Sequence, residues 1–342
     1  MRAAVYYNNN DVRVEEKPVP RIGAGEVLMK IEACGICGSD VMEWYRIKHA
    51  PLVLGHEVSG VIETVGEGVT KYKMGQRIVA AHHVPCNTCR YCLSGNHTVC
   101  DTLRSTNFDP GGFAEYVRLP QINVDRGIFP VADSVSFEDA TFVEPLACVL
   151  RGQRKAGVKE GQSVLIMGGG ISGLLHLKLA RALGAGRAFV TDILENRLTA
   201  AKRYGADQAF PADEYSPELL KEHNDGYLAD IVIICTGATR AFEDAFRSVG
   251  RGGSILLFAP TQAGLKLPIS LNDLFWKNDV TMTTTYAGSP ADHVTAHELI
   301  RSKKVIVSDM ITHRFGLADT QKGFGLVSKG NDSIKVIIEP QR

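Results

Sequence analysis

The stretch SVLIMGGGISG, residues 163–173, decides the fold of the second half of the chain. Its apolar start predicts a buried strand, and the glycines that follow match G-x-G-x-x-G at Gly168, Gly170 and Gly173. Such glycines allow a tight turn, let the backbone approach a pyrophosphate, and let helix and strand pack closely. The phosphates would meet the positive end of the following helix. The expected dinucleotide contacts are Gly168, Gly170, Ile171, Ser172 and Gly173.

Strand-like and helix-like segments alternate after this turn. This βαβ pattern predicts an α/β domain with a doubly wound parallel sheet, which we expect to span residues 151–287. The predicted strands are 188–192, 230–235 and 253–258, and the predicted helices are 174–183, 195–204 and 241–249.

Asp192 ends the second predicted strand and lies about 20 residues beyond Gly173, where an acidic residue binds the adenosine ribose. A carboxylate there repels a 2′-phosphate, so the sequence predicts NAD rather than NADP as cofactor. The alternative is that Asp192 caps the following helix. Arg197 could reach the same ribose or lie on a solvated helix face, and Thr236, after the next strand, is a further expected cofactor contact.

Four cysteines with the spacing C-x2-C-x2-C-x7-C predict a structural zinc site, because four thiolates close a tetrahedral coordination sphere. The alternative is two disulfides, which would require an oxidising compartment. The N-terminus reads as a strand and lacks the apolar core of a signal peptide, so we expect a cytoplasmic protein with reduced thiols. The four expected ligands are Cys86, Cys89, Cys92 and Cys100.

A second cluster of metal-ligating residue types comes from CGICGSD (34–40), GHEVSG (55–60) and the EPL at 144–146. One thiolate, one imidazole and one or two carboxylates form the incomplete ligand set of a catalytic zinc, which leaves a position for water or substrate. We therefore expect two zinc ions per chain. The expected catalytic ligands are Cys37, His56 and Glu144, with Glu57 either a fourth ligand or an immediate neighbour, and both glutamates are expected to take part in catalysis.

Length and charge limit the remaining possibilities. A chain of 342 residues predicts two domains, and its first 150 residues read as short strands with glycine turns, typical of a distorted β-barrel. Lys+Arg and Asp+Glu balance at 38 each, which argues against a nucleic-acid partner. No apolar run is long enough to predict a membrane span.

These motifs, together with GGFAEY at 111–116, occur in the order typical of zinc-dependent medium-chain dehydrogenases. The chain resembles the sorbitol (polyol) and threonine dehydrogenase branch of that family. The resemblance implies a GroES-like β-barrel catalytic domain formed by residues 1–150 and 288–342, beside a Rossmann NAD-binding domain. We also expect a homo-oligomer, either a dimer or a tetramer.

The resemblance further implies oxidation of a secondary alcohol, most simply a polyol, with NAD as hydride acceptor. It gives Ser39 the role of taking the alcohol proton, although a glycine-rich turn also explains a serine there. Met42 stands where the branch often has a relay histidine, and His49 could substitute. We expect Trp44 to pack in the core. The alternatives are a threonine-type dehydrogenase, a zinc-free reductase of the superfamily, and a zinc-stapled protein without catalysis.

Overall fold

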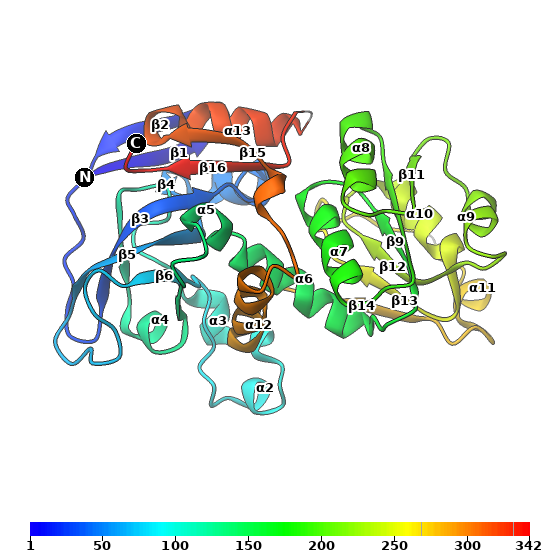
Figure 1. Ribbon diagram of the computed structural model, residues 1–342, viewed down its shortest axis with the longest axis horizontal. Helices are drawn as coiled ribbons and strands as arrows, with labels where there is room; N and C mark the ends of the chain where they lie inside the picture. The colour runs from blue at the N-terminus through cyan, green and yellow to red at the C-terminus, as the bar shows by residue number, and fades with distance from the viewer. Residues whose placement is uncertain (268, 331) are drawn as a thin grey trace. The chain divides into compact units, whose positions relative to one another are not determined.

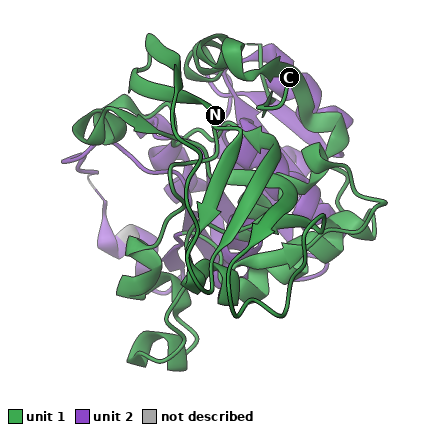
Figure 2. Ribbon diagram, turned by 90° about the vertical axis from the view of Figure 1, so that its left-hand side faces the viewer, with its two compact units in different colours: residues 1–147, 287–342 green, residues 148–286 purple. Residues whose placement is uncertain are grey.

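A computed structural model describes residues 1–267, 269–330 and 332–342. Contacts divide the chain into two compact units (Figure 2): unit 1 comprises Met1–Ala147 and Ala287–Arg342, and unit 2 comprises Cys148–Tyr286. None of the helices in these described ranges has the length and apolar character needed to span a bilayer.

Unit 1 is built on two sheets of short strands. One is three-stranded, in the order β2-β1-β4, and the other is seven-stranded, in the order β15-β16-β3-β5-β6-β8 with β7 paired to β3. The strands described in this unit are β1 (Arg2–Asn8), β2 (Asp11–Glu16), β3 (Val27–Gly35), β4 (Leu52–Val53), β5 (Glu57–Val65), β6 (Arg77–Ala80), β7 (Tyr116–Leu119), β8 (Ile128–Pro130), β15 (Ile311–Gly316) and β16 (Lys335–Glu339).

The C-terminal strands join the sheet that the N-terminal half begins. β16 runs antiparallel to β3, with Ile337 opposite Gly35 and Ile338 opposite Cys34, and β15 lies beside it (Figure 1). Residues separated by most of the chain thus meet at one end of β3. The core beneath contains an apolar cluster that includes Met29, Phe113 and Phe324.

Helices and 3-10 turns connect the strands of unit 1. α12 starts with a capping box in which the Ser289 hydroxyl accepts from the Asp292 N–H and the Asp292 carboxylate accepts from the Ser289 N–H. The remaining elements are α1 (Glu43–Arg46), η1 (Ile47–His49), α2 (Arg90–Leu93), η2 (His97–Val99), α3 (Asp101–Ser105), α4 (Gln121–Arg126), α5 (Phe137–Ala140), α6 (Val143–Ala156, which continues into unit 2), α12 (Pro290–Arg301), η3 (Ser308–Met310), η4 (Leu317–Asp319) and α13 (Thr320–Lys329).

Unit 2 contains a six-stranded parallel sheet in the order β11-β10-β9-β12-β13-β14. Numbered within the unit this is 3-2-1-4-5-6, the strand order of dinucleotide-binding domains. Every residue of β9 is buried, as its apolar sequence predicts for a central strand. The strands are β9 (Ser163–Met167), β10 (Arg187–Asp192), β11 (Gln208–Pro211), β12 (Ala229–Ile234), β13 (Val249–Leu257) and β14 (Thr281–Thr284).

Helices alternate with these strands. α7 contacts β9 and β10, and α10 contacts β12 and β13. The predicted combination of a domain of short β-strands with a doubly wound parallel sheet agrees with these two units. The helices are α7 (Ile171–Ala182), α8 (Glu195–Arg203), α9 (Pro217–His223), α10 (Thr239–Ser248) and α11 (Leu271–Phe275).

Candidate functional site

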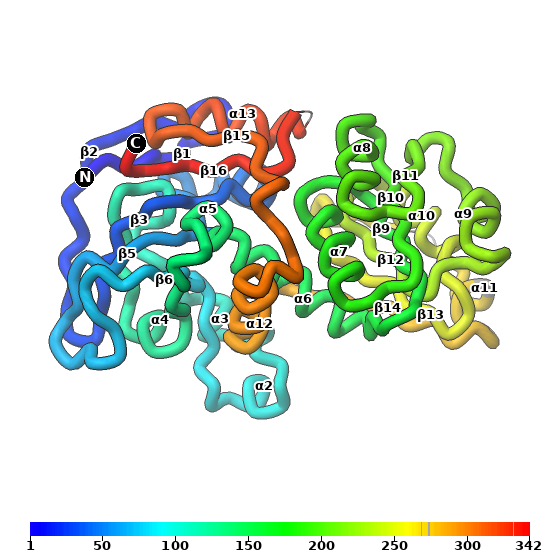
Figure 3. The backbone as a smooth tube through the Cα atoms, in the orientation of Figure 1, coloured from blue at the N-terminus to red at the C-terminus, as the bar shows by residue number. Residues whose placement is uncertain are grey.

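The loop that carries α2 extends away from the sheets of unit 1 (Figure 3) and gathers the four predicted cysteines. Their sulfur atoms all lie within 4.8 Å of one another. Neighbouring Sγ atoms are 3.9 Å apart for Cys86 and Cys92, and 3.6 Å apart both for Cys89 and Cys92 and for Cys100 and Cys86. A disulfide would need about 2.05 Å, so the disulfide alternative is not what the structure shows, and all eight cysteines are free.

These separations fit a zinc ion. Four sulfurs about 2.3 Å from a central zinc form a tetrahedron with edges of about 3.8 Å. The Cys86 sulfur also accepts backbone N–H groups of Thr88 and Cys89, at 3.4 and 3.2 Å. Such donors stabilise thiolate charge, so the donor set and spacing suit a closed metal site.

The cysteines differ in their protonation equilibria. Hydrogen bonds from Thr88 and the loop backbone lower the pKa of Cys86 to about 5. Burial, together with the hydrogen bond to Cys89, raises the pKa of Cys92 to about 12. Several thiolates this close repel one another unless a cation neutralises them, which is what a divalent metal would do.

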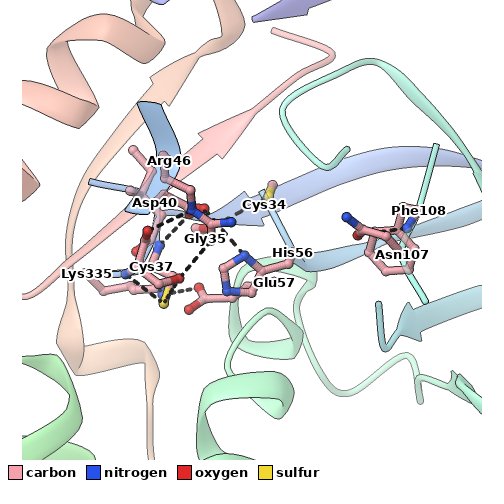
Figure 4. Close-up of polar contacts among 12 residues, drawn as sticks. Cys34, Gly35, Cys37, Asp40, Arg46, His56, Glu57, Asn107, Phe108 and Lys335 are labelled. Carbon is pink, nitrogen blue, oxygen red and sulfur yellow. Dashed lines mark hydrogen bonds and ion pairs between the residues drawn. The ribbon is translucent and has the colours of Figure 1, made fainter. Parts of the chain in front are cut away.

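The second predicted cluster forms where β3 ends and β5 begins (Figure 4). Cys37 follows β3, His56 precedes β5 and Glu57 is the first residue of β5, and one ligand atom from each lies within 4.8 Å of the others. Neighbouring strands of one sheet thus bring together a soft, an intermediate and a hard ligand. That set can hold a zinc with a position left open.

Asp40 orients the ligands of this group. Its carboxylate is fully buried, accepts from the Cys37 backbone N–H at 3.0 Å and faces His56 Nδ1 at 3.4 Å. Burial opposes protonation of His56, but the Asp40 carboxylate and the Cys37 thiolate raise its pKa well above the usual range. With Nδ1 held by a carboxylate, Nε2 is the nitrogen presented to a metal.

Glu57 is held by a residue that the sequence did not predict. Lys335, the first residue of β16, donates its Nζ to the Glu57 carboxylate and to the Ile36 carbonyl oxygen at 3.2 Å, and both charged side chains are 1% exposed. A Cβ at Gly35 would overlap the Glu57 carboxylate and lie 2.6 Å from Lys335 Cε. Only glycine fits beside this buried ion pair.

Ser39 lies between the cysteine ligand and a cation. Its hydroxyl donates to Cys37 Sγ at 3.3 Å and accepts from Arg46 Nη2 at 3.2 Å, while Arg46 Nε donates to the Ser39 carbonyl oxygen at 2.9 Å. Arg46 Nη2 is also 3.6 Å from Asp40 Oδ1. The serine predicted to move a proton is therefore an ordered hydrogen-bonding group.

Two histidines from the loop after β6 border the group. The His82 ring centroid lies 4.7 Å from that of His56 and 3.8 Å from that of His83. Burial holds the pKa of His82 well below its usual range, and its Nδ1 is buried without a hydrogen-bond partner among the described residues. His82 is thus a neutral imidazole beside the metal-binding group.

Other predicted residues have different outcomes. Glu144 is buried near the start of α6 but is not a member of the group formed by Cys37, His56 and Glu57, so its role as a ligand stays a prediction. Trp44 is 45% exposed, which makes the prediction of core packing wrong. Met42 is half-buried and His49 is exposed at the end of η1.

The glycine turn of unit 2 lies between β9 and α7, next to the end of β12. A Cβ at Gly173 would overlap the Gly168 carbonyl oxygen, so helix and strand approach as the motif predicts. At Gly170 a Cβ would meet only the Arg197 guanidinium, at 3.9 Å. Gly170 is the N-cap of α7 and supplies no side-chain acceptor, so this turn suits a pyrophosphate.

Asp192 serves two structural purposes at this turn. One carboxylate oxygen accepts from the Gly169 N–H at 2.7 Å and faces Arg197 Nη1 at 3.4 Å, and the other accepts from the Leu194 N–H at 2.9 Å. Leu194 is the N-cap of α8 and receives no side-chain cap, so Asp192 does not cap the helix as the alternative predicted, although its contact with Leu194 orders the turn before α8. Thr236 lies against the turn, with its Cβ 3.2 Å from a Cβ built on Gly168.

Comparison with known proteins identifies the family. Residues 23–127 match the alcohol dehydrogenase GroES-like domain, and residues 172–302 match the zinc-binding dehydrogenase domain. A sorbitol dehydrogenase of Halalkalibacterium halodurans is 32% identical over 337 residues, which cover 96% of this chain and 95% of that protein. The chain belongs to the zinc-dependent medium-chain dehydrogenases.

Other relatives match this chain over nearly the whole length of both proteins. The sorbitol dehydrogenase of Bacillus subtilis is 30% identical over 356 residues, covering 100% of this chain and 98% of that one. The structure of galactitol-1-phosphate dehydrogenase from Escherichia coli is 27% identical, with a TM-score of 0.87, and the match covers 99% of this chain and 100% of that one. The predicted family and its dehydrogenase activity on alcohols are confirmed, and the alternative of a non-catalytic binding protein is wrong.

Asp40, Arg46 and Lys335 are the functional-site residues that sequence reasoning missed. Asp40 stands inside the motif that was used, and Lys335 is a lone lysine in the apolar run IKVII. A lysine in a central strand must find a buried partner, which is the signal that could have identified it.

Proposed function

We propose that this chain is a zinc- and NAD-dependent polyol dehydrogenase that oxidises a secondary alcohol to a ketone. The group Cys37, His56 and Glu57, with the Ser39 hydroxyl bonded to its sulfur, is the observation that carries the proposal. Relatives named sorbitol dehydrogenase and galactitol-1-phosphate dehydrogenase support the substrate class. Unit 1 would be the catalytic domain and unit 2 the NAD-binding domain.

Two zinc ions would have different roles. The four cysteines would hold a structural ion, and Cys37, His56 and Glu57 would hold a catalytic ion, with Glu144 as a further candidate ligand. A catalytic zinc supplies a Lewis acid that lowers the pKa of a bound alcohol, and NAD accepts the hydride.

The protein residues would orient the alcohol and handle its proton. Ser39 would accept the proton from the alcohol. Arg46 holds the Ser39 oxygen but can only donate, so as Ser39 accepts the alcohol proton its own hydroxyl proton would pass to the cofactor ribose hydroxyl and then to water. Asp40 keeps His56 in one orientation, and Lys335 neutralises Glu57, so that this carboxylate adds less negative charge to the metal site.

NAD selection is assigned to Asp192. In Asp192→Ala, the ribose contact and the repulsion of a 2′-phosphate are both lost, so the ratio of kcat/KM for NAD to that for NADP should fall by about 10- to 100-fold. Asp192→Asn is the matched control, since it keeps a hydrogen-bonding group while removing the charge. If both variants leave the ratio unchanged, Asp192 only orders the turn before α8.

The direct test of the function is an NAD-reduction screen with metal-loaded enzyme. We expect turnover of sorbitol, xylitol or a vicinal diol at higher kcat/KM than ethanol, because a second hydroxyl beside the reacting one adds orienting contacts. Ethanol used equally well, or a strong preference for L-threonine, would contradict the polyol assignment.

Assembly and location are further parts of the proposal. β14 is an edge strand of the described six-stranded sheet, and Leu271 and Trp276 nearby in sequence are 68% and 65% exposed. An open edge with apolar residues near it supports a homo-oligomer, a dimer or a tetramer, which light scattering would detect. Eight free cysteines support a cytoplasmic, reducing environment.

A further inference from the structure

Arg46 places a cation at the group that would handle the alcohol. It is the last residue of α1, and its side chain is 19% exposed and lies beside Asp40 (Figure 4). It also donates to the carbonyl oxygen and the hydroxyl of Ser39. Its contact with Ser39 Oγ brings a guanidinium next to the hydroxyl to which the proposed function assigns the alcohol proton. The arginine thus lies beside the hydroxyl to which the alcohol would bind.

The guanidinium of Arg46 makes hydrogen bonds to the described residues through only two of its three nitrogen atoms. Nε donates to the Ser39 carbonyl oxygen and Nη2 donates to the Ser39 hydroxyl. Within the part of the chain that the structure describes, Nη1 has no hydrogen-bond partner. The guanidinium carbon also lies 4.7 Å from the centre of the Tyr45 ring, which covers one face and leaves the planar edge as the binding surface.

The charge of Arg46 is only partly compensated. Asp40 lies 3.6 Å from Nη2, beyond good hydrogen-bond distance, and this buried carboxylate already accepts from the Cys37 N–H and faces His56. Glu43 on the same helix lies 3.3 Å from the Asn9 N–H instead. Lys48 follows in the exposed η1 turn and adds positive charge. The segment after the zinc cysteine has two acidic and two basic residues, but Asp40 is buried, so its accessible part has one more cation than anion.

The geometry fits an anion on the substrate itself. An alcohol hydrogen-bonded to Ser39 at about 2.8 Å would have its oxygen within about 6 Å of Arg46 Nη2, because the two share one partner. A group a few carbon atoms from the reacting carbon would reach the free edge. A guanidinium presents parallel N–H groups that match the two oxygens of a carboxylate or phosphate. A neutral hydroxyl could accept one of these hydrogen bonds but would not neutralise the positive charge of the arginine.

We infer that the substrate is an anionic polyol, either a sugar acid or a sugar phosphate, whose carboxylate or phosphate binds Arg46. This rests on the proposed function and narrows its substrate class. The other anion that could use the same cation is the pyrophosphate of the cofactor, and the test separates the two.

The experiment compares sorbitol, D-gluconate and sorbitol 6-phosphate as substrates of metal-loaded enzyme with saturating NAD. We expect at least one of the two anions to have a higher kcat/KM than sorbitol. Arg46→Met loses the contacts to Ser39 and should therefore lower kcat for both kinds of substrate. Its kcat/KM for that anion should fall by about 10- to 100-fold more than its kcat/KM for sorbitol. Arg46→Lys keeps the charge but loses the planar guanidinium, so its kcat/KM for the anion should lie between the values of the unchanged enzyme and of Arg46→Met. Lys48→Met removes a nearby charge with no described contact to Ser39, and it should keep the preference.

A binding measurement gives a readout independent of turnover. Calorimetric titration of the NADH complex with gluconate and sorbitol 6-phosphate should show an affinity for the preferred anion that Arg46→Met weakens at least tenfold. Sorbitol oxidised better than both anions would overturn the inference, as would an Arg46→Met variant whose KM for NAD rises while both substrate classes fall equally. Binding of the anion through Arg46 without oxidation of any alcohol would overturn the proposed function and would leave Arg46 as an anion-binding residue only.

Discussion

The two clusters of metal-ligating residues in unit 1 are built in opposite ways. The cysteine cluster takes all four ligands from one loop between Cys86 and Cys100, and its sulfurs hold one another at near-tetrahedral spacing. The second cluster takes its ligands from the ends of β3 and β5 and its charged support from β16, 278 residues from Glu57. One site is local, and the other exists only when the sheet is complete.

Because of this difference, we expect the loop cluster to contribute to stability and the second cluster to contribute to catalysis. Four thiolates occupy all four coordination positions of a zinc ion and leave none for a substrate, so an ion in the loop cluster can only cross-link the loop. The sheet cluster surrounds Cys37, His56 and Glu57 with Asp40, Arg46 and Lys335, which set the charge and orientation of a site that stays open. Changes to each site should therefore have different consequences.

The largest expected effect is the loss of the buried cation. Lys335→Met leaves the Glu57 carboxylate buried without its partner and should lower the free energy of unfolding by about 3–5 kcal/mol, measured in urea. The double variant Glu57→Gln/Lys335→Met removes both charges and should recover at least half of that loss. Equal destabilisation of the single and double variants would show that the ion pair is not what Lys335 contributes.

Opening the loop cluster should have a smaller effect. Cys89→Ser should lower the zinc content from two ions per chain to one and destabilise the protein by about 2–3 kcal/mol, the scale of a cross-link closing a loop of this length. Cys148→Ser is the matched control, because that cysteine lies outside both clusters. Loss of both ions from Cys89→Ser would contradict independent sites.

The smallest effect on stability should come from a chelator. Brief treatment with a chelator should remove the open-site metal first, abolishing NAD reduction while shifting the thermal midpoint by only a few degrees. Added zinc should restore turnover. If NAD reduction continues after the open site has lost its ion and stops only when the loop cluster also loses its ion, the open site is not the catalytic site.

Sequence reasoning succeeded where the determinants are local. The turn at residues 168–173 and the cysteine loop each fit within a short segment, so spacing alone predicts their geometry. Lys335 and Arg46 could not be placed that way. Lys335 reaches Glu57 because β16 pairs with β3, and Arg46 reaches Ser39 because α1 turns back after the zinc cysteine.

Residues whose type permits two purposes also limited the prediction. Asp192 was left as either a ribose contact or a cap, and its carboxylate orders both the glycine turn and the turn before α8. Trp44 reads as a core residue by hydrophobicity, yet the four-residue helix α1 buries none of its side chains. Helix length and neighbouring elements decide burial there, and neither is visible in the residue itself.

The most direct test of the central claim is the zinc content and polyol turnover of Cys37→Ser measured on the same preparation. The account predicts one zinc per chain, an unfolding midpoint close to that of the unchanged protein, and no detectable NAD reduction with any polyol that the unchanged enzyme oxidises. A Cys37→Ser enzyme that keeps two zinc ions and normal turnover would show that the cluster of Cys37, His56 and Glu57 is not the catalytic centre.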